Sequence, residues 1–365
     1  MKSFMDLFDD CTSQGTKIKT DEYLENGKYA IVDQGQNDIA GYTNIEDGVY
    51  ENIPAIIFGD HTRAIKYINT PFFLGADGVK LLKAKDVEAN YKYLYYALRN
   101  AKIPNTGYNR HYKWLKEVRI EYPNKEKQKE VVEILDKIEL IMNNRKQQLH
   151  QFDTLIKARF VEMFGNVDTG NYRYKTYKLG DVASVGSSHR VFTTEFVEKG
   201  VPFYRGTEIG ELANGIKPTE PYFISKEQYN RLANDDTKPQ IGDLLMPSIC
   251  NKGQVWMVDT KEPFYYKDGR VLCISPDREI FDTKYLEYFM RVKTLVTYPK
   301  LGSGSTFAEF KIFLLKGIDV LVPPRNLQEQ FADFVRQVDK SKAAIQKSLD
   351  ETQLLFDSLM QKYFG

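Results

Sequence analysis

The sequence predicts an α+β protein that is built as a pseudo-two-fold tandem repeat. Two globular domains of mixed strands and short helices alternate with two long helices, and the helices pair with each other as an antiparallel coiled coil. Three observations predict this class: a stretch that occurs twice, a heptad pattern within each copy, and strand-rich sequence ahead of each copy. A repeat of this kind defines the units from which a chain is built.

The last 51 residues repeat an earlier stretch at a constant offset of 200, without a gap. Only eight positions are identical, so the repeat rests on the shared hydrophobic pattern and on the absence of gaps. The identical positions are Leu115-Lys116 with Leu315-Lys316, Pro123 with Pro323, Gln128 with Gln328, Leu149 with Leu349, Leu155 with Leu355, and Phe164-Gly165 with Phe364-Gly365.

Each copy begins with a short apolar strand that runs into proline. The strands are Val118 to Tyr122 and Ile318 to Val322, and the prolines are Pro123 and Pro323-Pro324. Because proline is tolerated at a helix start and disfavoured inside a helix, a helix is expected to follow each proline. No Pro or Gly occurs between residues 124 and 163, so the first helix can extend about 60 Å at ~1.5 Å per residue.

Both predicted helices carry apolar residues at alternating spacings of four and three, which is the heptad rule of a coiled coil. Three polar residues interrupt the two seams at different levels, namely Arg145, Lys342 and Thr352. A polar seam residue lowers stability but helps to fix the register of the pair. The alternative is that each helix packs separately on its own domain, but the length of both heptad runs favours pairing. The seams are Val131, Leu135, Ile138, Met142, Arg145, Leu149, Phe152, Ile156 and Phe331, Val335, Val338, Lys342, Ile345, Leu349, Thr352, Phe356, Leu359, Tyr363.

The sequence ahead of each helix is rich in Tyr, Phe, Val, Ile and Gly with turn signals between apolar runs, which favours short strands. The two regions also resemble each other weakly: Pro71-Phe72-Phe73 corresponds to Pro263-Phe264-Tyr265, and residues 92–96 and 284–288 both look like a short helix. We therefore expect domains at residues 1–122 and 166–322 and long helices at 123–165 and 323–365.

Composition excludes several classes of protein. Hydrophobic residues make up 42% of the chain and aromatic residues 13%, which argues against disorder. No apolar run approaches the roughly 20 residues of a membrane helix, and the N-terminus lacks the apolar region of a signal peptide. The three cysteines are far apart and form neither a metal pair nor a disulfide framework. We expect a cytoplasmic protein with reduced thiols and no membrane partner.

The net charge of +1 means that any basic stripe for nucleic acid must be local.

Motifs of catalysis do not occur. There is no phosphate-binding loop, no dinucleotide fingerprint, no zinc-protease helix and no nucleophile elbow. The tripeptide Glu309-Phe310-Lys311 has a nuclease-like spacing, but it is too common to indicate a nuclease. The run from Gly302 to Thr306 is either a flexible turn or a backbone nest for a phosphate. We therefore expect no enzymatic activity, no metal and no cofactor in this chain.

Three of the four histidines lie within two residues of an arginine, in polar segments beside apolar strands. Such side chains, with Asn, Gln, Ser and Thr, contact base edges and phosphates in DNA complexes. Each segment alone is equally well an ordinary polar loop, and the case for DNA rests on their occurrence in both domains. The candidate DNA-binding residues are Gln34, Gln36, His61, Thr62, Arg63, Asn109, Arg110, His111, Ser187, Ser188, His189, Arg190, Arg205, Asn251, Lys252, Ser303, Ser305 and Thr306.

Residues 31–36, 39–43 and 56–63 are very similar to one target-recognition class of a known family, and residues 178–182 (Lys-Leu-Gly-Asp-Val) are similar to the usual domain start in that family. Over essentially its whole length the chain thus resembles the specificity subunit of a type I restriction-modification system. The junction from Leu315 to Pro324, with Gln328 and Gln330, is typical of the family. The first copy departs from it, because Asn124 stands where a second proline is usual.

The resemblance implies that each globular domain is a target-recognition domain for one half of a split double-stranded DNA site. The paired helices would set the spacer between the half-sites and, with the domain edges, dock two methyltransferase subunits. S-adenosylmethionine would bind to those subunits and not to this chain. Two motor-nuclease subunits would join for cleavage, and this chain would be non-catalytic.

Two alternatives remain on the sequence alone. One is the recognition subunit of a methyltransferase-only system. The sequence of this chain does not separate that system from a restriction system, because the nuclease would be another chain. The other is a coiled-coil scaffold whose domains bind protein or sugar. A scaffold needs neither the His61-Thr62-Arg63 loop nor the amide-rich loops, so Arg63→Ala would leave its function unchanged.

Overall fold

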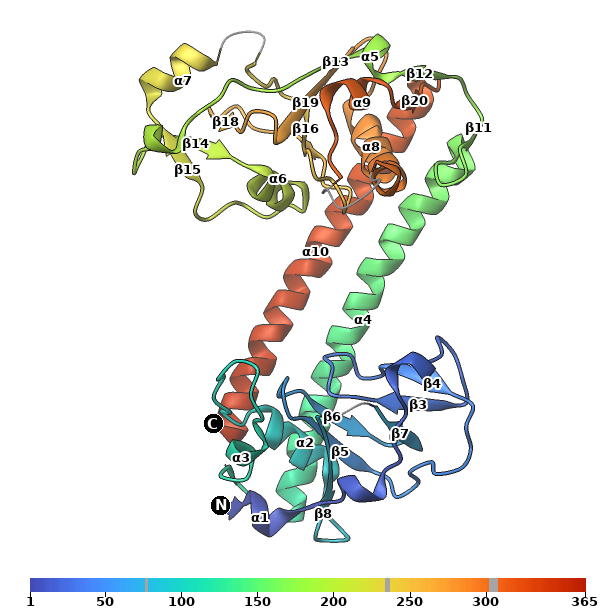
Figure 1. The fold of residues 1–365 in the computed structure, drawn as a ribbon, viewed down its shortest axis with the longest axis vertical. Helices are drawn as coiled ribbons and strands as arrows, with labels where there is room; N and C mark the ends of the chain where they lie inside the picture. The colour runs from blue at the N-terminus through green and yellow to red at the C-terminus, as the bar shows by residue number, and fades with distance from the viewer. Residues whose placement is uncertain (76–77, 234–236, 302–307) are drawn as a thin grey trace. The chain divides into compact units, whose positions relative to one another are not determined.

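The structure is a computed structural model that describes residues 1–75, 78–233, 237–301 and 308–365. It divides into two compact units. Unit 1 comprises Met1–Gln148 and Ile345–Gly365, and unit 2 comprises Leu149–Ala344. We call the globular part of unit 1 the first head and that of unit 2 the second head. Each unit also holds about half of each long helix (Figure 1).

Two small sheets form the first head. A four-stranded antiparallel sheet has the order β2-β8-β5-β6, and a three-stranded sheet has the order β4-β3-β7, in which β3 and β7 are parallel. All five residues of the central strand β5 are buried, as its continuous apolar sequence predicts. The elements are β1 (Lys2–Ser3), α1 (Phe4–Leu7), β2 (Phe8–Asp10), η1 (Thr12–Gln14), η2 (Thr20–Glu22), β3 (Tyr29–Val32), β4 (Gly41–Thr43), β5 (Ala55–Gly59), β6 (Ile65–Ile68), β7 (Phe72–Leu74), β8 (Val79–Ala84), α2 (Tyr91–Arg99), α3 (Tyr112–Leu115) and β9 (Arg119–Ile120).

The second head repeats this topology. Its sheets have the orders β13-β19-β16-β17 and β15-β14-β18, and β14 and β18 are again parallel. The added elements are two helices, α6 and α7, on either side of β15. The elements are β10 (Gly165–Asn166), β11 (Asn171–Tyr172), β12 (Thr176–Lys178), α5 (Leu179–Val182), β13 (Ala183–Gly186), η3 (Thr193–Glu195), β14 (Val201–Tyr204), α6 (Gly206–Ala213), β15 (Tyr222–Ile224), α7 (Lys226–Leu232), β16 (Leu244–Pro247), β17 (Trp256–Met257), β18 (Tyr265–Tyr266), β19 (Val271–Pro276), α8 (Thr283–Thr297), η4 (Tyr298–Lys300), α9 (Ile312–Lys316) and β20 (Asp319–Leu321).

The short helix that the sequence predicts in each head is present as α2 and as α8. Asn90 and Asp282 cap the two helices, since each side chain accepts a hydrogen bond from a backbone amide of the first turn. The strands predicted before the two prolines are shorter than expected: β9 has two residues and β20 has three. β9 pairs with β1 and β20 pairs with β12, in both cases antiparallel.

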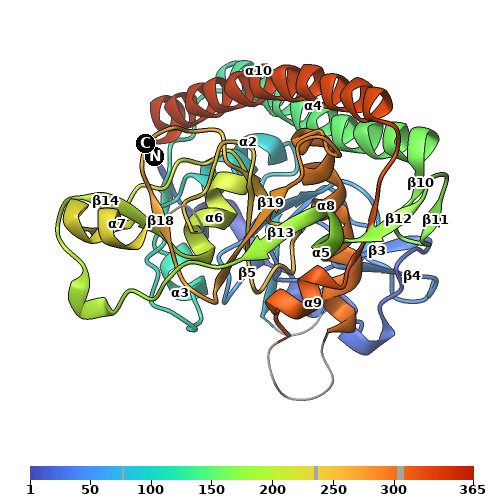
Figure 2. The ribbon, with the colours of Figure 1, turned by 90° about the horizontal axis from the view of Figure 1, so that it is seen from above.

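The two long helices are α4 (Lys125–Phe164) and α10 (Arg325–Phe364). Within each unit they lie side by side and antiparallel (Figures 1 and 2). Every residue of the two predicted seams is buried or half-buried. The heptad pattern, the antiparallel pair and the α+β class of the heads are thereby confirmed.

The polar seam residues pair across the two helices. In unit 1, the guanidinium of Arg145 donates hydrogen bonds to the carbonyl of Ser348 at 2.8 Å and to the hydroxyl of Thr352. In unit 2, Lys342 forms an ion pair of 2.6 Å with Asp153. Because each polar group has its partner at one level only, these contacts favour a single register of the helices.

An aromatic cluster fastens the helices to the second head. The ring of Phe160 on α4 lies 5.4 Å from that of Phe331 on α10 and 5.2 Å from that of Tyr288 on α8. Phe160 is 2% exposed. It therefore joins three helices of unit 2 in one core.

Truncating Phe160 tests this core. Phe160→Ala is expected to lower the free energy of unfolding of unit 2 by about 3–5 kcal/mol, because it leaves a cavity among aromatic rings. Denaturant unfolding can be followed by the fluorescence of the buried Trp256 in a Trp114→Phe background. Leu155→Ala is the matched control, since Leu155 lies on the same helix but is 48% exposed. An equal loss of stability in both variants would contradict the cluster's importance.

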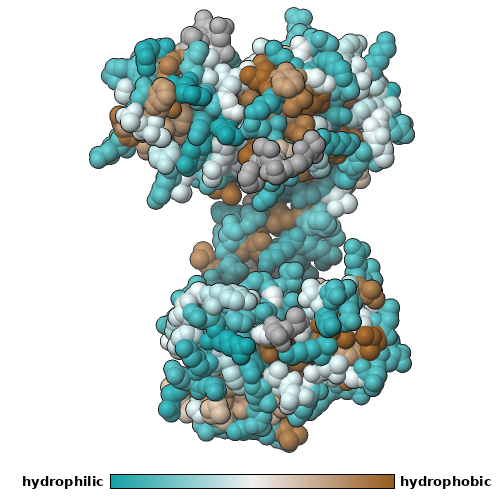
Figure 3. All heavy atoms as spheres, viewed as in Figure 1, coloured by the Kyte–Doolittle hydropathy of each residue, from teal (hydrophilic) through white to brown (hydrophobic). Residues whose placement is uncertain are grey.

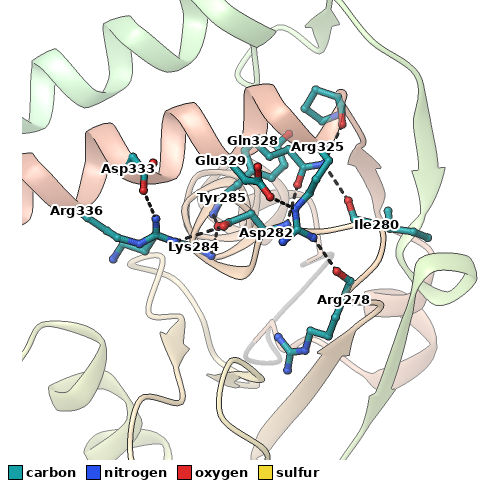
Figure 4. Close-up of polar contacts among 11 residues, drawn as sticks. Arg278, Ile280, Asp282, Lys284, Tyr285, Arg325, Gln328, Glu329, Asp333 and Arg336 are labelled. Atoms are coloured by element: carbon teal, nitrogen blue, oxygen red, sulfur yellow. Dashed lines mark hydrogen bonds and ion pairs between the residues drawn. The ribbon is translucent and has the colours of Figure 1, made fainter.

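The repeated glutamines, Gln128 and Gln328, close the first turn of each long helix. Each side chain is buried and donates from Nε2 to the carbonyl of its own proline, Pro123 or Pro323, at 2.8 Å. In unit 2 the same amide also donates to the Ile280 carbonyl and accepts from the backbone amide of the residue that caps α8, both at 3.0 Å (Figure 4). The glutamine identity in the repeat therefore has a structural cause.

Charged residues extend the unit 2 junction on the surface. Arg325 donates to the Arg278 carbonyl at 2.7 Å and pairs with Glu329, and Arg336 pairs with Asp282 at 3.3 Å (Figure 4). These contacts join α10 to the segment that leads into α8.

None of the helices in the described part of the chain is both long and apolar enough to span a membrane.

Candidate nucleic-acid interface

In the first head, three backbone hydrogen bonds bring separate loops together at one edge of the sheets. Gly75 donates to the Val32 carbonyl at 2.8 Å, Asp60 to the Gly78 carbonyl at 2.7 Å, and His111 to the Asp60 carbonyl at 2.8 Å. We call this edge the first loop face. It consists of residues 33–40, 60–64 and 100–111 together with Gly75 and Gly78.

The second head has the same three hydrogen bonds at corresponding positions. Lys267 donates to the Tyr204 carbonyl at 2.9 Å, Ser248 to the Arg270 carbonyl at 2.8 Å, and Phe310 to the Ser248 carbonyl at 2.7 Å. We call this edge the second loop face. Its described parts are residues 205–221, 248–255, 267–270, 298–301 and 308–311. Both heads therefore contain the same three backbone hydrogen bonds, which we call the platform, and the platform carries different side chains in the two heads.

Gln34, His61 and Thr62 are in direct contact on the first loop face. The amide of His61 donates to Oε1 of Gln34 at 3.3 Å, and the Thr62 hydroxyl donates to the Gln34 carbonyl. Gly59 precedes this turn, and a Cβ there would lie 2.7 Å from the carbonyl oxygen of Gln34. A glycine is therefore required for the two loops to approach so closely.

Asp33 anchors the loop that carries Gln34. Its carboxylate accepts from the backbone amide of Gly35 at 2.8 Å and lies 3.5 Å from Nζ of Lys66. The Lys66 side chain is only 2% exposed. Burial lowers the pKa of Lys66, and the attraction of Asp33 opposes this change. The pair fixes the start of the loop against β6.

Arg63 has the positive φ of 63° that is uncommon outside glycine. Its guanidinium donates to the Ile103 carbonyl at 3.2 Å. The arginine therefore ties the turn after β5 to the segment between α2 and α3. A strained backbone held by surrounding contacts is frequent at functional sites.

His61 stacks on Tyr108, with ring centroids 4.6 Å apart and planes 8° from parallel. Tyr108 is 86% exposed, so the pair presents an aromatic surface to solvent. Nδ1 of His61 is buried and has no hydrogen-bond partner among the described residues. Sequence reasoning missed Tyr108, although it is the one aromatic ring in the polar run from Asn105 to Arg110.

The other first-head candidates divide into exposed and buried residues. Gln36, Asn109 and Arg110 are exposed. His111 is 0% exposed, and its Nδ1 lies 2.9 Å from the Asp60 carbonyl oxygen. The second head has the buried Phe310 at the corresponding place in the backbone pattern. His111 is thus an interior residue that holds the platform, and its side chain does not face a ligand.

In the second head, Ser187 and Ser188 support the platform through backbone contacts. The Ser187 hydroxyl donates to the Val271 carbonyl and accepts from the Gly269 amide, both at 2.8 Å. The Ser188 hydroxyl donates to the Tyr266 carbonyl. Both hydroxyls thus hold the β18–β19 turn.

The remaining second-head candidates are exposed or lie outside the described residues. His189, Arg190, Asn251 and Lys252 are exposed. Arg190 donates from Nε to Asp268 at 3.1 Å, so it reaches the same turn as the two serines. Ser303, Ser305 and Thr306 lie outside the described residues.

A groove of about 750 Å³ crosses the second loop face. Arg205 lies at one side, where its guanidinium pairs with Glu208 at 2.5 Å and stacks over the Tyr222 ring at 4.5 Å. Burial favours a higher pKa for Glu208, but the hydrogen bonds from Arg205 outweigh it and hold that pKa below its usual value. The other lining residues are Gly206, Thr207, Pro247, Ser248, Ile249, Gln254, Lys267, Arg270 and Glu309.

Arg270 and Glu309 form an ion pair of 2.7 Å in this groove. Lys311 also binds the Glu309 carboxylate, and the two cations hold the pKa of Glu309 below its ordinary value, Lys311 contributing more. Sequence reasoning missed Lys267 and Arg270. The Asp268-Gly269 pair is a turn signal in the sequence, and Lys267 and Arg270 lie directly on either side of it. Two cationic residues beside a turn were therefore the signal that could have identified them.

Among the described residues, no group of three or more His, Cys, Asp or Glu side chains is placed to hold a metal ion. Both loop faces carry amide, guanidinium and hydroxyl groups, and such groups bind base edges and phosphates. Polar residues also cover most of the visible surface of both heads (Figure 3).

The fold and the two loop faces define a protein with two similar recognition heads on paired helices. Residues 2–151 and 171–352 match the family model of the type I restriction modification DNA specificity domain. The chain therefore belongs to the family of type I restriction-modification specificity subunits.

Two kinds of relatives agree with this assignment. An alignment over 233 residues, which covers 57% of this chain, is 28% identical to the specificity subunit of the type I restriction enzyme EcoR124I/EcoR124II of Escherichia coli, of which the chain spans about half (54%). The type I S subunit from M. genitalium matches over 100% of this chain and 95% of its own, with a TM-score of 0.61 and 17% identity. A chain from a structure on complex assembly and conformational transition of the type I R-M system matches over 92% and 91%, with a TM-score of 0.52 and 17% identity. The structural matches show a shared fold.

Proposed function

We propose that this chain is the non-catalytic, DNA-reading subunit of a type I restriction-modification complex, in which each head reads one half of a bipartite double-stranded site. The observation that carries the proposal is the shared platform of the two heads. Identical backbone contacts hold loops whose side chains differ, and this is what two readers of different half-sites require. We also propose residues 1–122 and 166–322 as the two recognition domains.

The long helices would set the spacer between the half-sites and dock two methyltransferase subunits, with two restriction subunits in the full complex. The polar seam pairs support this role, because two helices that set a spacer of fixed length need a single register. S-adenosylmethionine would be held by the methyltransferase subunits. The exposed loop residues would contact DNA, and His111, Ser187 and Ser188 would position the loops.

A net charge of only +1 bears on how the complex grips DNA. Phosphate contacts dominate affinity and make it salt-dependent. The partner subunits would therefore supply part of the phosphate contact. The isolated chain is expected to bind its site weakly, with a shallower salt dependence than the complex. Tight binding by the isolated chain with a steep salt dependence would contradict this division.

Arg63→Ala tests the first loop face. Losing the hydrogen bond to the Ile103 carbonyl releases the segment between α2 and α3, and a hydrogen bond from a charged group contributes about 1.5–3 kcal/mol. Methylation directed by the first half-site is expected to fall roughly 10-fold or more, while the protein still melts cooperatively at a somewhat lower midpoint. Arg63→Gly is the matched control for backbone strain, since glycine accepts a positive φ. Unchanged methylation in both variants would remove Arg63 from the reading surface.

A further inference from the structure

The two loop faces carry different side chains at two corresponding backbone positions. In the first head, Gly78 has no side chain, and a Cβ there would lie 2.6 Å from Oε1 of Gln34. The Gln34 amide therefore occupies the space above Gly78. In the second head, Arg270 stands at the position of Gly78 in the backbone pattern.

The position of Gln34 differs between the heads as well. Val32 and Tyr204 correspond, because each accepts the hydrogen bond from the residue that follows the parallel partner strand. Counting two residues onward, Gln34 corresponds to Gly206. One head thus combines a glutamine with a glycine, and the other combines a glycine with an arginine, at the same two positions of the platform.

The Arg270 side chain is exposed to solvent, and an ion pair holds one end of its guanidinium in place. It is 58% exposed, and its Nη1 is held at 2.7 Å by Glu309, whose own side chain is 21% exposed. Nζ of Lys311 and the Ser248 hydroxyl also contact the Glu309 carboxylate. An arginine fixed at one end keeps its remaining donors aimed at the groove, which reduces the entropy lost on binding.

We propose that these two corresponding positions determine base specificity, with Arg270 reading a guanine in the half-site of the second head and Gln34 an adenine in that of the first. The inference rests on the proposed function and names its reading residues. Arginine binds the O6 and N7 acceptors of guanine with two donors, and glutamine binds the N6 donor and N7 acceptor of adenine. An amide oxygen has two lone pairs, so Oε1 of Gln34 can accept from His61 and from a base together. Glu309 is a positioning residue for Arg270.

The test uses the complex of the full chain with its methyltransferase subunit, and the readout is the genome-wide methylation motif. Arg270→Gln is expected to reduce the preference for guanine at one position of the second half-site by about 5- to 150-fold, while the first half-site stays unchanged. Arg270→Lys keeps the charge but loses the two-donor fork, and should relax the same position. Arg231→Gln is the matched control, because Arg231 is 68% exposed and paired with Glu195 at 3.7 Å but belongs to α7 and not to the second loop face.

The first head provides an independent arm. Gln34→Glu keeps an acceptor for the His61 amide but replaces the amide donor, so the preference for adenine should fall at one position of the first half-site only. Glu309→Gln should weaken the guanine preference in the direction of Arg270→Gln. Unchanged base preference in Arg270→Gln and Gln34→Glu, with a bipartite motif retained, would overturn the inference and leave the proposed function standing. Absence of a bipartite motif for the unaltered chain would instead refute the proposed function.

Discussion

Lengthening both long helices by one heptad is expected to widen the gap between the two half-sites by up to about 3 base pairs. Seven helical residues add roughly 10 Å at ~1.5 Å per residue, and DNA rises about 3.4 Å per base pair. Duplicating residues 142–148 and residues 338–344 places both insertions at the boundary between the two units. A whole heptad preserves the seam, because every apolar residue keeps its face. The methylation motif should keep both half-sites and change only its spacer.

A single insertion is the control for this experiment. With the heptad added to α10 alone, the Arg145–Thr352 and Phe160–Phe331 contacts cannot both form, so the pair of helices should lose stability and methylation should fall. If the double insertion left the spacer unchanged, the helices would not set the spacer length.

Replacing the first head by a second copy of the second head is expected to give a site whose two half-sites are the same. The graft exchanges residues 1–122 for residues 175–322. It is feasible because the two heads share strand order, the pairing of their first and last strands, and the hydrogen bonds of the platform. The first half-site should be lost entirely from the methylation motif, and the second should appear twice.

The complementary exchange replaces the second head by that of another family member and should change one half-site only. Wild-type protein with the same affinity tag controls for expression. A graft that kept the original first half-site, or that altered both halves together, would show that the heads do not read independently.

The long helices could be predicted almost completely from the sequence because their signals are local. The heptads, the prolines at 123 and 323 and the unbroken run between them determine a helix without knowledge of distant residues. Pairing followed from the coincidence of two such seams. The role of Gln128 and Gln328 needed the structure, because each side-chain amide donates to the carbonyl of its own proline, a contact that no sequence pattern identifies.

The common topology of the heads was less accessible. Strand pairs such as β3 with β7 join residues more than forty positions apart, and sequence periodicity carries no information about partners. The insertion of α6 and α7 also separates corresponding strands by unequal distances along the chain. The two regions therefore looked more divergent in sequence than they are in fold.

The candidate site shows the same division. The His61-Thr62-Arg63 loop was recognisable because its residues are adjacent in the sequence. Burial of His111 could not be foreseen, since a polar neighbourhood in sequence says nothing about the side of a loop that faces the core. The Arg270–Glu309 pair joins residues 39 positions apart, and only the fold brings them together.

The most direct test of the central claim is to co-express the chain with its methyltransferase subunit and to map methylated adenines across the host genome. The account predicts a bipartite motif with two specific half-sites and a gap of fixed length. Methylation at a single continuous motif, or no sequence-specific methylation by an assembled complex, would contradict it.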